Sequence, residues 1–129
     1  GPYSRFQLKQ YIEQTQNDLF ADRQLRLMIE NGNRQVVGIV DLCSFDPLHN
    51  RAEVGIMVDK SCRRQGIGRN ALALLEEHCF RYLGIHQLFA YIAVENLPSR
   101  RLFAACGYKE SAVLKEWAVA IRMCWLSRS

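Results

Sequence analysis

The chain has 129 residues, of which 49% are hydrophobic and 23% are charged, and its formal net charge at pH 7 is +4. This length suits one domain with its own core, and the composition is ordinary for a soluble globular protein. No apolar run approaches the roughly 20 residues that a membrane-spanning helix needs, and no signal peptide is visible, so we expect no membrane partner.

The cysteine and histidine patterns argue against a disulfide framework and against a metal site. Five cysteines are present, an odd number, and no two of them form a C-x-x-C pair. This usage predicts reduced thiols in a cytoplasmic protein. The three histidines lack metal-ligand spacing, so we expect no bound metal. The modest positive charge is compatible with nucleic-acid binding, but no module for that function is visible and we expect no such partner.

The first half of the chain is predicted to contain one helix followed by three strands. Ser4 and Gln7 are spaced as a capping box, and apolar residues recur after them at helical spacing, which predicts a helix that ends near Asp22. The pair Asn31-Gly32 predicts a hairpin turn, and the pair Asp46-Pro47 breaks the strand that follows. The predicted strands cover residues 25–29, 36–45 and 52–58.

The second half is predicted to alternate helices and strands. A helical apolar stripe runs up to Gly84, a residue type that ends helices in the left-handed conformation. Asn96 is placed to cap a short helix that continues through Cys106. The predicted helices cover residues 70–83 and 96–106, and the predicted strands cover residues 88–94, 108–114 and 117–126. The chain therefore reads as a single α/β domain over residues 1–129 with a mixed sheet.

A glycine-rich turn at residues 62–69 follows the predicted strand at 52–58. Gly66 and Gly68 have no Cβ atom, so the backbone can adopt left-handed angles and approach a ligand closely. The amide groups of the turn and of the first helical turn lack carbonyl partners within the helix. They therefore form a binding site for an anion, most simply a phosphate. The arginines of the turn are Arg63, Arg64 and Arg69. Such a glycine pair also occurs where a chain simply turns, and its spacing does not separate the two interpretations.

The pattern Arg63-x-x-Gly66-x-Gly68 resembles the Q/R-x-x-G-x-G/A signature of the GNAT superfamily of N-acetyltransferases. The strand before the turn and the Asn96-x-x-Ser99 segment also match this family, so the resemblance covers most of the chain. It implies the GNAT acyl-CoA N-acyltransferase fold, in which the turn holds the pyrophosphate of acetyl-CoA. That fold normally has a further strand and helix before the first helix of this chain, so the resemblance implies an N-terminally truncated domain.

The resemblance assigns acetyl-CoA, as co-substrate, to the end of strand 52–58, the turn and the short helix. The residues implied are Met57, Val58, Arg63, Arg64, Gln65, Gly66, Ile67, Gly68, Arg69, Asn96, Ser99 and Phe103. Asn96 and Ser99 have helix capping as a compatible alternative. Relatives often have at Phe103 a tyrosine that protonates the departing thiolate, so we expect solvent or another group to do so here, or a weak catalyst. The alternative is that Phe103 is a plain core aromatic.

Glu53 is the candidate general base. Side chains alternate along the strand at 52–58, which places Glu53 and Met57 on one face. An amine that is protonated at neutral pH must lose a proton before it attacks, and a carboxylate in a cleft can accept that proton. The alternative is a solvated strand-face glutamate paired with Arg51.

Two segments resemble bacterial spermidine N-acetyltransferases: the Arg-Ala-Glu triplet at 51–53 and the last strand at 120–124. The resemblance implies a small-molecule amine substrate, specifically a polyamine whose charges are bound by Glu30, Asp41 and Glu53. The alternatives are acetylation of a protein N-terminus or of a small-metabolite amine, an acetyl-CoA-binding domain without turnover, and a basic nucleic-acid-binding module. The sequence leaves a homo-oligomer open.

Overall fold

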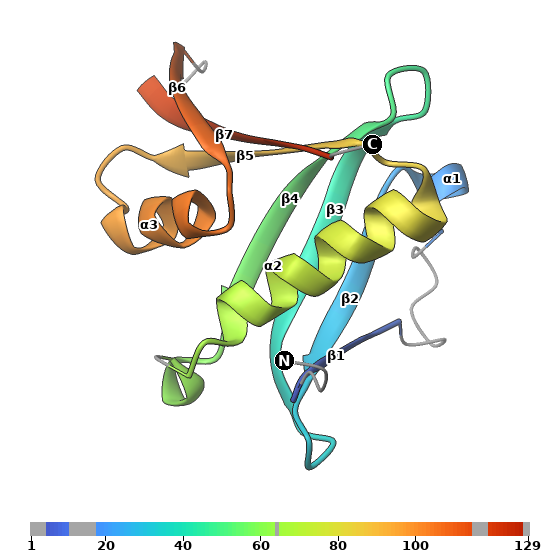
Figure 1. Ribbon diagram of the computed structural model, residues 1–129, viewed down its shortest axis with the longest axis vertical. Coiled ribbons are helices and arrows are strands. Elements are labelled where there is room, and N and C mark those ends of the chain that lie inside the picture. The colour runs from blue at the N-terminus through green and yellow to red at the C-terminus, as the bar shows by residue number, and fades with distance from the viewer. Residues whose placement is uncertain (1–4, 11–17, 64, 115–118, 128–129) are drawn as a thin grey trace.

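The fold is a mixed seven-stranded sheet with helices packed on it, seen in a computed structural model that describes residues 5–10, 18–63, 65–114 and 119–127 (Figure 1). The strands are β1 (Gln7–Lys9), β2 (Leu25–Glu30), β3 (Val36–Asp46), β4 (Arg51–Val58), β5 (Gln87–Ala93), β6 (Lys109–Leu114) and β7 (Val119–Leu126). The helices are α1 (Leu19–Asp22), α2 (Ile67–His78) and α3 (Leu97–Ala105). The strand order is β1-β2-β3-β4-β5-β7-β6. This arrangement confirms the predicted α/β class with a mixed sheet.

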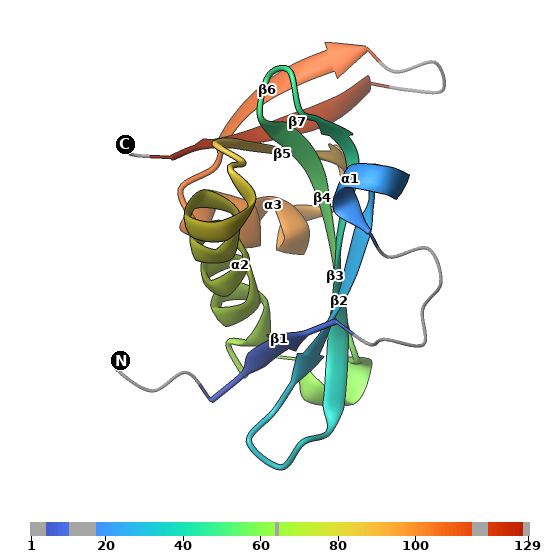
Figure 2. The same cartoon turned by 90° about the vertical axis from the view of Figure 1, so that its right-hand side faces the viewer.

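The main core lies between α2 and strands β2–β4, and a second helix, α3, packs beside β5 and β7 (Figure 2). The inward stripe of α2 is fully apolar and includes Ala71, Leu72 and Leu75, none of which is accessible to solvent. Burying a leucine of this kind contributes about 1.5–3 kcal/mol to stability. The predicted helical stop is confirmed, because a single π-helical turn (Cys79–Leu83) extends α2 up to Gly84, which has φ 67°.

Strands β4 and β5 form the only parallel pair among the described strands, and they separate early. Their register covers three residue pairs, from Arg51↔Gln87 to Glu53↔Phe89. Beyond Glu53, β4 stays paired with β3 while β5 continues with β7, and Figure 1 shows the two halves of the sheet diverging from this point. The sheet therefore opens between β4 and β5, at the end of β4 that contains Met57 and Val58.

The β3–β4 pairing depends on a glycine. A Cβ atom added at Gly38 would lie 2.6 Å from the Met57 carbonyl oxygen and 3.2 Å from the Val58 Cα. Backbone cannot move away as a flexible side chain can, so the close approach of the two strands requires glycine at this position. Gly38 thereby fixes the end of β4.

The predicted first helix is wrong at its start, since Gln7–Lys9 forms an edge strand paired with β2. The register joins Gln7 to Glu30 and Lys9 to Met28, so unpaired backbone groups of β2 find partners there. Residues 11–17 of the predicted helix lie outside the described part of the chain. A four-residue helix, α1, does end at Asp22 as expected.

The predicted hairpin is confirmed, but its turn is longer than the pair Asn31-Gly32. The Asn31 N–H donates to the Gln35 carbonyl oxygen (2.9 Å), and the left-handed residue is Arg34, with φ 62°. The Asn31 side-chain oxygen accepts hydrogen bonds from the backbone of Asn33 and Gln35 (2.9 Å each). Asparagine, rather than glycine, therefore organises this turn.

Candidate active site

A cleft of about 770 Å³ opens where the end of β4, the glycine-rich turn and the first half of α3 meet. Its walls come from segments that are far apart in the sequence. The lining residues are Ile56, Met57, Val58, Cys62, Arg63, Gly66, Ile67, Gly68, Arg69, Asn96, Pro98, Ser99 and Leu102. The split between β4 and β5 therefore leads into a space bordered by the start of α2 on one side and of α3 on the other.

The turn before α2 is built so that backbone amides remain unpaired at the cleft. Gly66 has φ 74° and precedes the first helical residue, and no side chain caps this helix end. The Asn70 side-chain nitrogen instead donates to the Gly66 carbonyl oxygen (2.8 Å), which fixes the turn. The first amides of a helix lack intrahelical acceptors and favour an anion. Arg63 and Arg69 line the same space and add positive charge.

Close packing of two helices fixes one end of the cleft. A Cβ atom added at Gly68 would lie 2.9 Å from Leu102 Cδ2, so glycine lets α3 approach the first turn of α2. Leu102 lines the cleft at that contact. Both glycines of the turn are therefore required by geometry, Gly66 for its left-handed backbone and Gly68 for its contact with α3.

Helix α3 forms one wall of the cleft, and a helix cap and an arginine fix its position. The Asn96 Oδ1 accepts a hydrogen bond from the Ser99 N–H (3.3 Å), which confirms the predicted cap. Arg100 donates to the Val94 carbonyl oxygen (2.8 Å) and pairs with Glu110 of β6 (3.0 Å). The first turn of α3 is thus tied to the end of β5 and to β6.

The cleft gathers nine of the twelve residues that the sequence analysis assigned to the cofactor. They are Met57, Val58, Arg63, Gly66, Ile67, Gly68, Arg69, Asn96 and Ser99. Gln65 is exposed outside the lining, and Arg64 lies outside the described residues. Sequence reasoning missed Ile56, Cys62, Pro98 and Leu102. Helical spacing from Ser99 was a usable signal for Leu102, which lies three residues further along α3.

Phe103 does not line the cleft. It is 3% exposed, belongs to the main hydrophobic core and packs edge to face on Tyr108, with ring centroids 4.9 Å apart. The alternative interpretation of Phe103, as a core aromatic, is therefore the one that the packing supports.

The side of the sheet turned away from α2 carries the candidate base. We call it the open face and define it by alternate strand residues outside the main core cluster: Arg26, Asp41, Cys43, Glu53, Gly55, Met57, Phe89, Tyr91, Arg122 and Cys124. Glu53 stands between Cys43 of β3 and Phe89 of β5 in the sheet register. Burial, and then the charge of Glu53, raises the pKa of Cys43, which places the carboxylate near that thiol. At Gly55 an added Cβ would meet no heavy atom within 4 Å, so the face is open beside Glu53.

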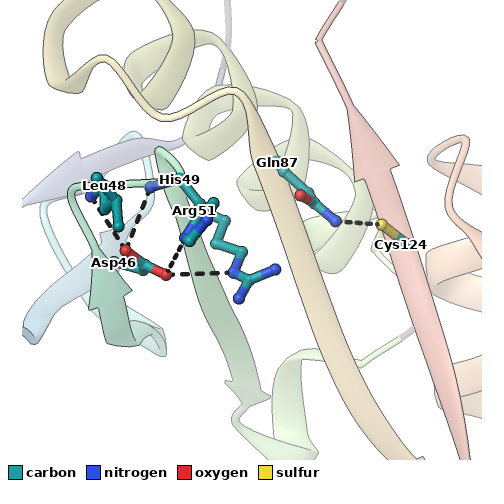
Figure 3. A network of polar contacts seen from close by, with 6 residues as sticks. All are labelled: Asp46, Leu48, His49, Arg51, Gln87 and Cys124. Carbon is teal, nitrogen blue, oxygen red and sulfur yellow. Dashed lines mark hydrogen bonds and ion pairs between the residues drawn. The ribbon is translucent and has the colours of Figure 1, made fainter.

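Glu53 does not pair with Arg51, the partner that the sequence alternative gave it. Figure 3 shows Arg51 directed at Asp46, with its Nε 3.5 Å from the carboxylate. Asp46 Oδ2 also lies 2.8 Å from His49 Nδ1, and the hydrogen bond with His49 holds the pKa of Asp46 below its usual range. Beside them, Gln87 donates to the Cys124 sulfur (3.3 Å). The first residues of β4 and β5 are thus anchored where the strands still pair.

The other two acidic residues assigned to the substrate already have cationic partners. Glu30 is 7% exposed and pairs with Lys9 (3.5 Å). Asp41 binds Arg26 through two hydrogen bonds, of 2.7 and 2.8 Å. Asp41 is registered with Gly55, close to Glu53, whereas Glu30 lies at the end of β2. The structure therefore does not gather the three carboxylates into one unneutralised cluster.

Comparison with known families identifies the fold. A family model described as an acetyltransferase (GNAT) domain matches residues 1–109. The chain belongs to the GNAT acetyltransferase family. This confirms the resemblance seen in the glycine-rich turn.

Spermidine N-acetyltransferases are among the GNAT proteins most similar to the chain. That of Vibrio cholerae is 26% identical over 116 residues, which cover 89% of the chain and 65% of the relative. That of Escherichia coli (strain K12) is 24% identical over 110 residues, which cover 80% of the chain and 59% of the relative. The chain thus spans about two thirds or less of these curated relatives.

Solved structures of the same kind share the fold. A chimera of the Vibrio cholerae spermidine N-acetyltransferase and hSSAT gives a TM-score of 0.82 at 19% identity, covering 95% of the chain and 96% of the chimera. The Vibrio cholerae enzyme in complex with CoA and spermine gives a TM-score of 0.76 at 23% identity, covering 84% of the chain and 69% of that structure. At these identities the likeness establishes the GNAT fold.

Neither a metal-ligand cluster nor a membrane-spanning helix occurs in the described part of this acetyltransferase domain. No three His, Cys, Asp or Glu side chains there are grouped so that they could hold a metal ion. None of the described helices has the length and apolar character needed to cross a membrane.

Adding a hydroxyl at Phe103 tests its place in the core. The ring is packed on all sides, so Phe103→Tyr is expected to bury a hydroxyl without a partner and to lower the free energy of unfolding by about 1–3 kcal/mol. Turnover per folded molecule is expected to stay unchanged. Denaturant unfolding and acetyl-CoA turnover measure the two effects. A faster enzyme of unchanged stability would return Phe103 to the cleft.

A half-buried acidic residue, Glu76, lies on α2. The Oε1 atom of Glu76 on α2 is buried and has no hydrogen-bond partner among the described residues, and burial raises its pKa to about 7. Burial, and then the charge of Glu76, also raises the pKa of Cys79 to about 12. The same two causes raise the pKa values of Cys106 and Tyr108. Ionisation of Glu76 therefore places a charge among groups that remain neutral.

Glu76 is expected to make the fold less stable at alkaline pH. Because its pKa is raised on folding, its contribution is present at acidic pH and is lost as the pH rises through about 7. Glu76→Gln removes the ionisation, so the variant should nearly match the parent at pH 5 and exceed it by about 1 kcal/mol at pH 9, because solvent screens the charge of the partly exposed side chain. Urea unfolding with reductant across this range measures the difference. Glu77→Gln, at an exposed neighbour on the same helix, is the control. Parallel curves for Glu76→Gln and the parent would contradict this assignment.

Proposed function

We propose that the chain is an acetyl-CoA-dependent N-acetyltransferase that transfers the acetyl group to a primary amine. The observation that carries the proposal is the cleft that joins the glycine-rich turn, the start of α3 and the end of β4. Its unpaired amides and arginines suit a pyrophosphate, and its volume suits an extended ligand. Arg64 and Gln65 belong to the same turn, and we include them with the lining residues as proposed cofactor contacts.

The proposed chemistry needs few groups from the protein. Acetyl-CoA brings the activated acyl group, and the protein positions it beside the split between β4 and β5. A backbone N–H at Met57 or Val58 would polarise the thioester carbonyl. Glu53 would take the proton of the incoming ammonium, directly or through water. A carbon–nitrogen bond forms as the carbon–sulfur bond breaks, and the departing thiolate takes a proton from solvent because Phe103 offers none.

The similar enzymes favour a polyamine such as spermidine as the acceptor. Glu53 is the proposed acidic group for it, because Asp41 and Glu30 already have cationic partners. The names of the relatives are the main support. A small-metabolite amine or a protein N-terminus is the alternative acceptor. We also propose a cytoplasmic location, supported by five free thiols, and a homo-oligomer, by analogy with the dodecameric Vibrio cholerae relative.

The test is release of free thiol from acetyl-CoA with a panel of amines. Spermidine, a set of monoamines and amino acids, and a short peptide are incubated with the protein, and thiol is measured against a no-amine control. Turnover with any member supports the acetyltransferase, and the preferred member gives the acceptor class. Binding of acetyl-CoA without turnover on any member would instead make the chain a non-catalytic binding domain.

A further inference from the structure

Arg122 is a positive charge on the open face that the proposed mechanism does not use. It lies on β7, registered with Tyr91 of β5 and Ser111 of β6. Its guanidinium carbon lies over the Phe89 ring, 5.1 Å from the centroid. Phe89 is itself registered with Glu53 of β4. Strand β5, which carries Phe89, lies between the strands that carry Glu53 and Arg122. Since neighbouring strands are about 4.8 Å apart, the two charged residues lie within the length of a small molecule.

Part of Arg122 is buried without a partner. Its Nε atom is inaccessible to solvent and makes no hydrogen bond to any described residue. No ion pair joins Arg122 to a carboxylate in the part of the chain that the structure describes. A buried donor that stays unpaired costs stability, so such a group calls for an explanation. Arginine has a planar fork of donors that matches a carboxylate or another oxyanion.

The charges around Glu53 do not suit a polycation. Asp41 is already neutralised by Arg26 through two hydrogen bonds, and Glu30 is paired with Lys9. A polyamine whose first ammonium is held at Glu53 would bring its second ammonium close to the Arg122 guanidinium if it extended toward β7. Like charges at such range repel, whereas an acidic group at the same place would pair with the guanidinium of Arg122, a side chain that is only partly buried.

We infer that the acceptor is a primary amine that also carries an acidic group, with its amine at Glu53 and its acidic group on Arg122 across Phe89. This rests on the proposed function and selects the small-metabolite class over the polyamine. The aromatic ring between the two charged groups offers an apolar surface for the carbon chain that links amine and acid. A carboxylate is the simplest such group.

The test uses three acceptors with the same five-carbon chain. 5-Aminopentanoate, pentylamine and 1,5-diaminopentane have one amine in common and end in a carboxylate, a methyl group or an ammonium. The inference predicts kcat/KM in that order, with the carboxylate at least about tenfold above the methyl, as expected for a charge-assisted hydrogen bond. A polyamine enzyme gives the reverse order, which would overturn the inference.

Variants then assign the preference to Arg122. Arg122→Gln is expected to bring the ratio of kcat/KM for the carboxylate acceptor to kcat/KM for the methyl acceptor to within about threefold of one. Arg122→Lys keeps the charge but loses the planar guanidinium, so it is expected to give an intermediate ratio. Arg81→Gln removes an exposed charge from the helical segment on the other side of the sheet and should leave the ratio as it is. A ratio unchanged in a folded Arg122→Gln protein would refute the role of Arg122.

The inference can fail separately from the proposed function. If none of the three acceptors turns over, their affinities are measured on the coenzyme A-bound protein, where the carboxylate must still bind at least about tenfold more tightly than the other two. Equal affinities would refute the inference while coenzyme A binding still supported the proposed function. Failure to bind coenzyme A would instead remove the proposed function.

Discussion

Coenzyme A is expected to raise the melting temperature of the protein and to leave that of Gly66→Glu unchanged. A ligand that binds only the folded state at a concentration of 100 times its Kd stabilises it by about 2.7 kcal/mol, or roughly 10 °C for a domain of this size. A Cβ atom at Gly66 would meet only the Asn70 side chain, at 3.7 Å, so a glutamate there has room to enter the cleft. Its charge would then oppose the pyrophosphate, and we expect the affinity to fall by more than about 100-fold.

The control for this variant is Gly84→Glu. Both glycines have left-handed backbones, with φ 74° at Gly66 and 67° at Gly84, so both variants carry a similar conformational cost of about 1–2 kcal/mol. Gly84 lies at the far end of the helical segment and does not line the cleft. Gly84→Glu should therefore have a lower melting temperature than the parent, but coenzyme A should raise that temperature as it does in the parent. An equal shift in the two variants would place the anion site elsewhere.

The glycine-rich turn and the caps could be predicted because their signals are local. Gly66 and Gly84 take left-handed angles that few other residues adopt, and Asn96 caps the helix that follows it. Each of these requirements falls within a few residues of the chain, so it appears in the sequence itself. The family signature uses the same turn, which explains why most residues of the cleft could be named from the sequence.

Other features could not be predicted because they depend on contacts between distant segments. The strand at Gln7–Lys9 exists through pairing with β2, and that partner outweighs the local capping pattern. The ion pairs of Glu30 and Asp41 follow from strand register. Phe103 shares a helical face with Ser99 by spacing, but the direction of that face is set by the packing of α3 on Tyr108. Sequence therefore found the cleft but not the charge balance on the open face.

Glu53→Gln is expected to lower kcat at pH 7 by about 100-fold or more while leaving the affinity for coenzyme A unchanged. An aliphatic amine has a pKa near 10, so at pH 7 nearly all of it is protonated and cannot attack until a base removes the proton. Glu53 lies on the open face beside the gap at Gly55, whereas the cleft proposed for coenzyme A is lined by other residues. The substitution is close in size and removes only the basic carboxylate.

The pH dependence separates a general base from a residue that merely shapes the site. If Glu53 removes the proton, the defect of Glu53→Gln should shrink toward pH 10, because the free amine then supplies the reactive species by itself. A loss of packing or of substrate affinity would instead persist at every pH. The measurement is kcat from pH 6.5 to 10 with saturating acetyl-CoA and the preferred amine, and the thermal shift with coenzyme A confirms binding. Glu77→Gln, which changes an exposed carboxylate on α2, should keep the parental profile. Parental turnover of Glu53→Gln at pH 7 would exclude Glu53 as the base and assign the proton transfer to water or to another group.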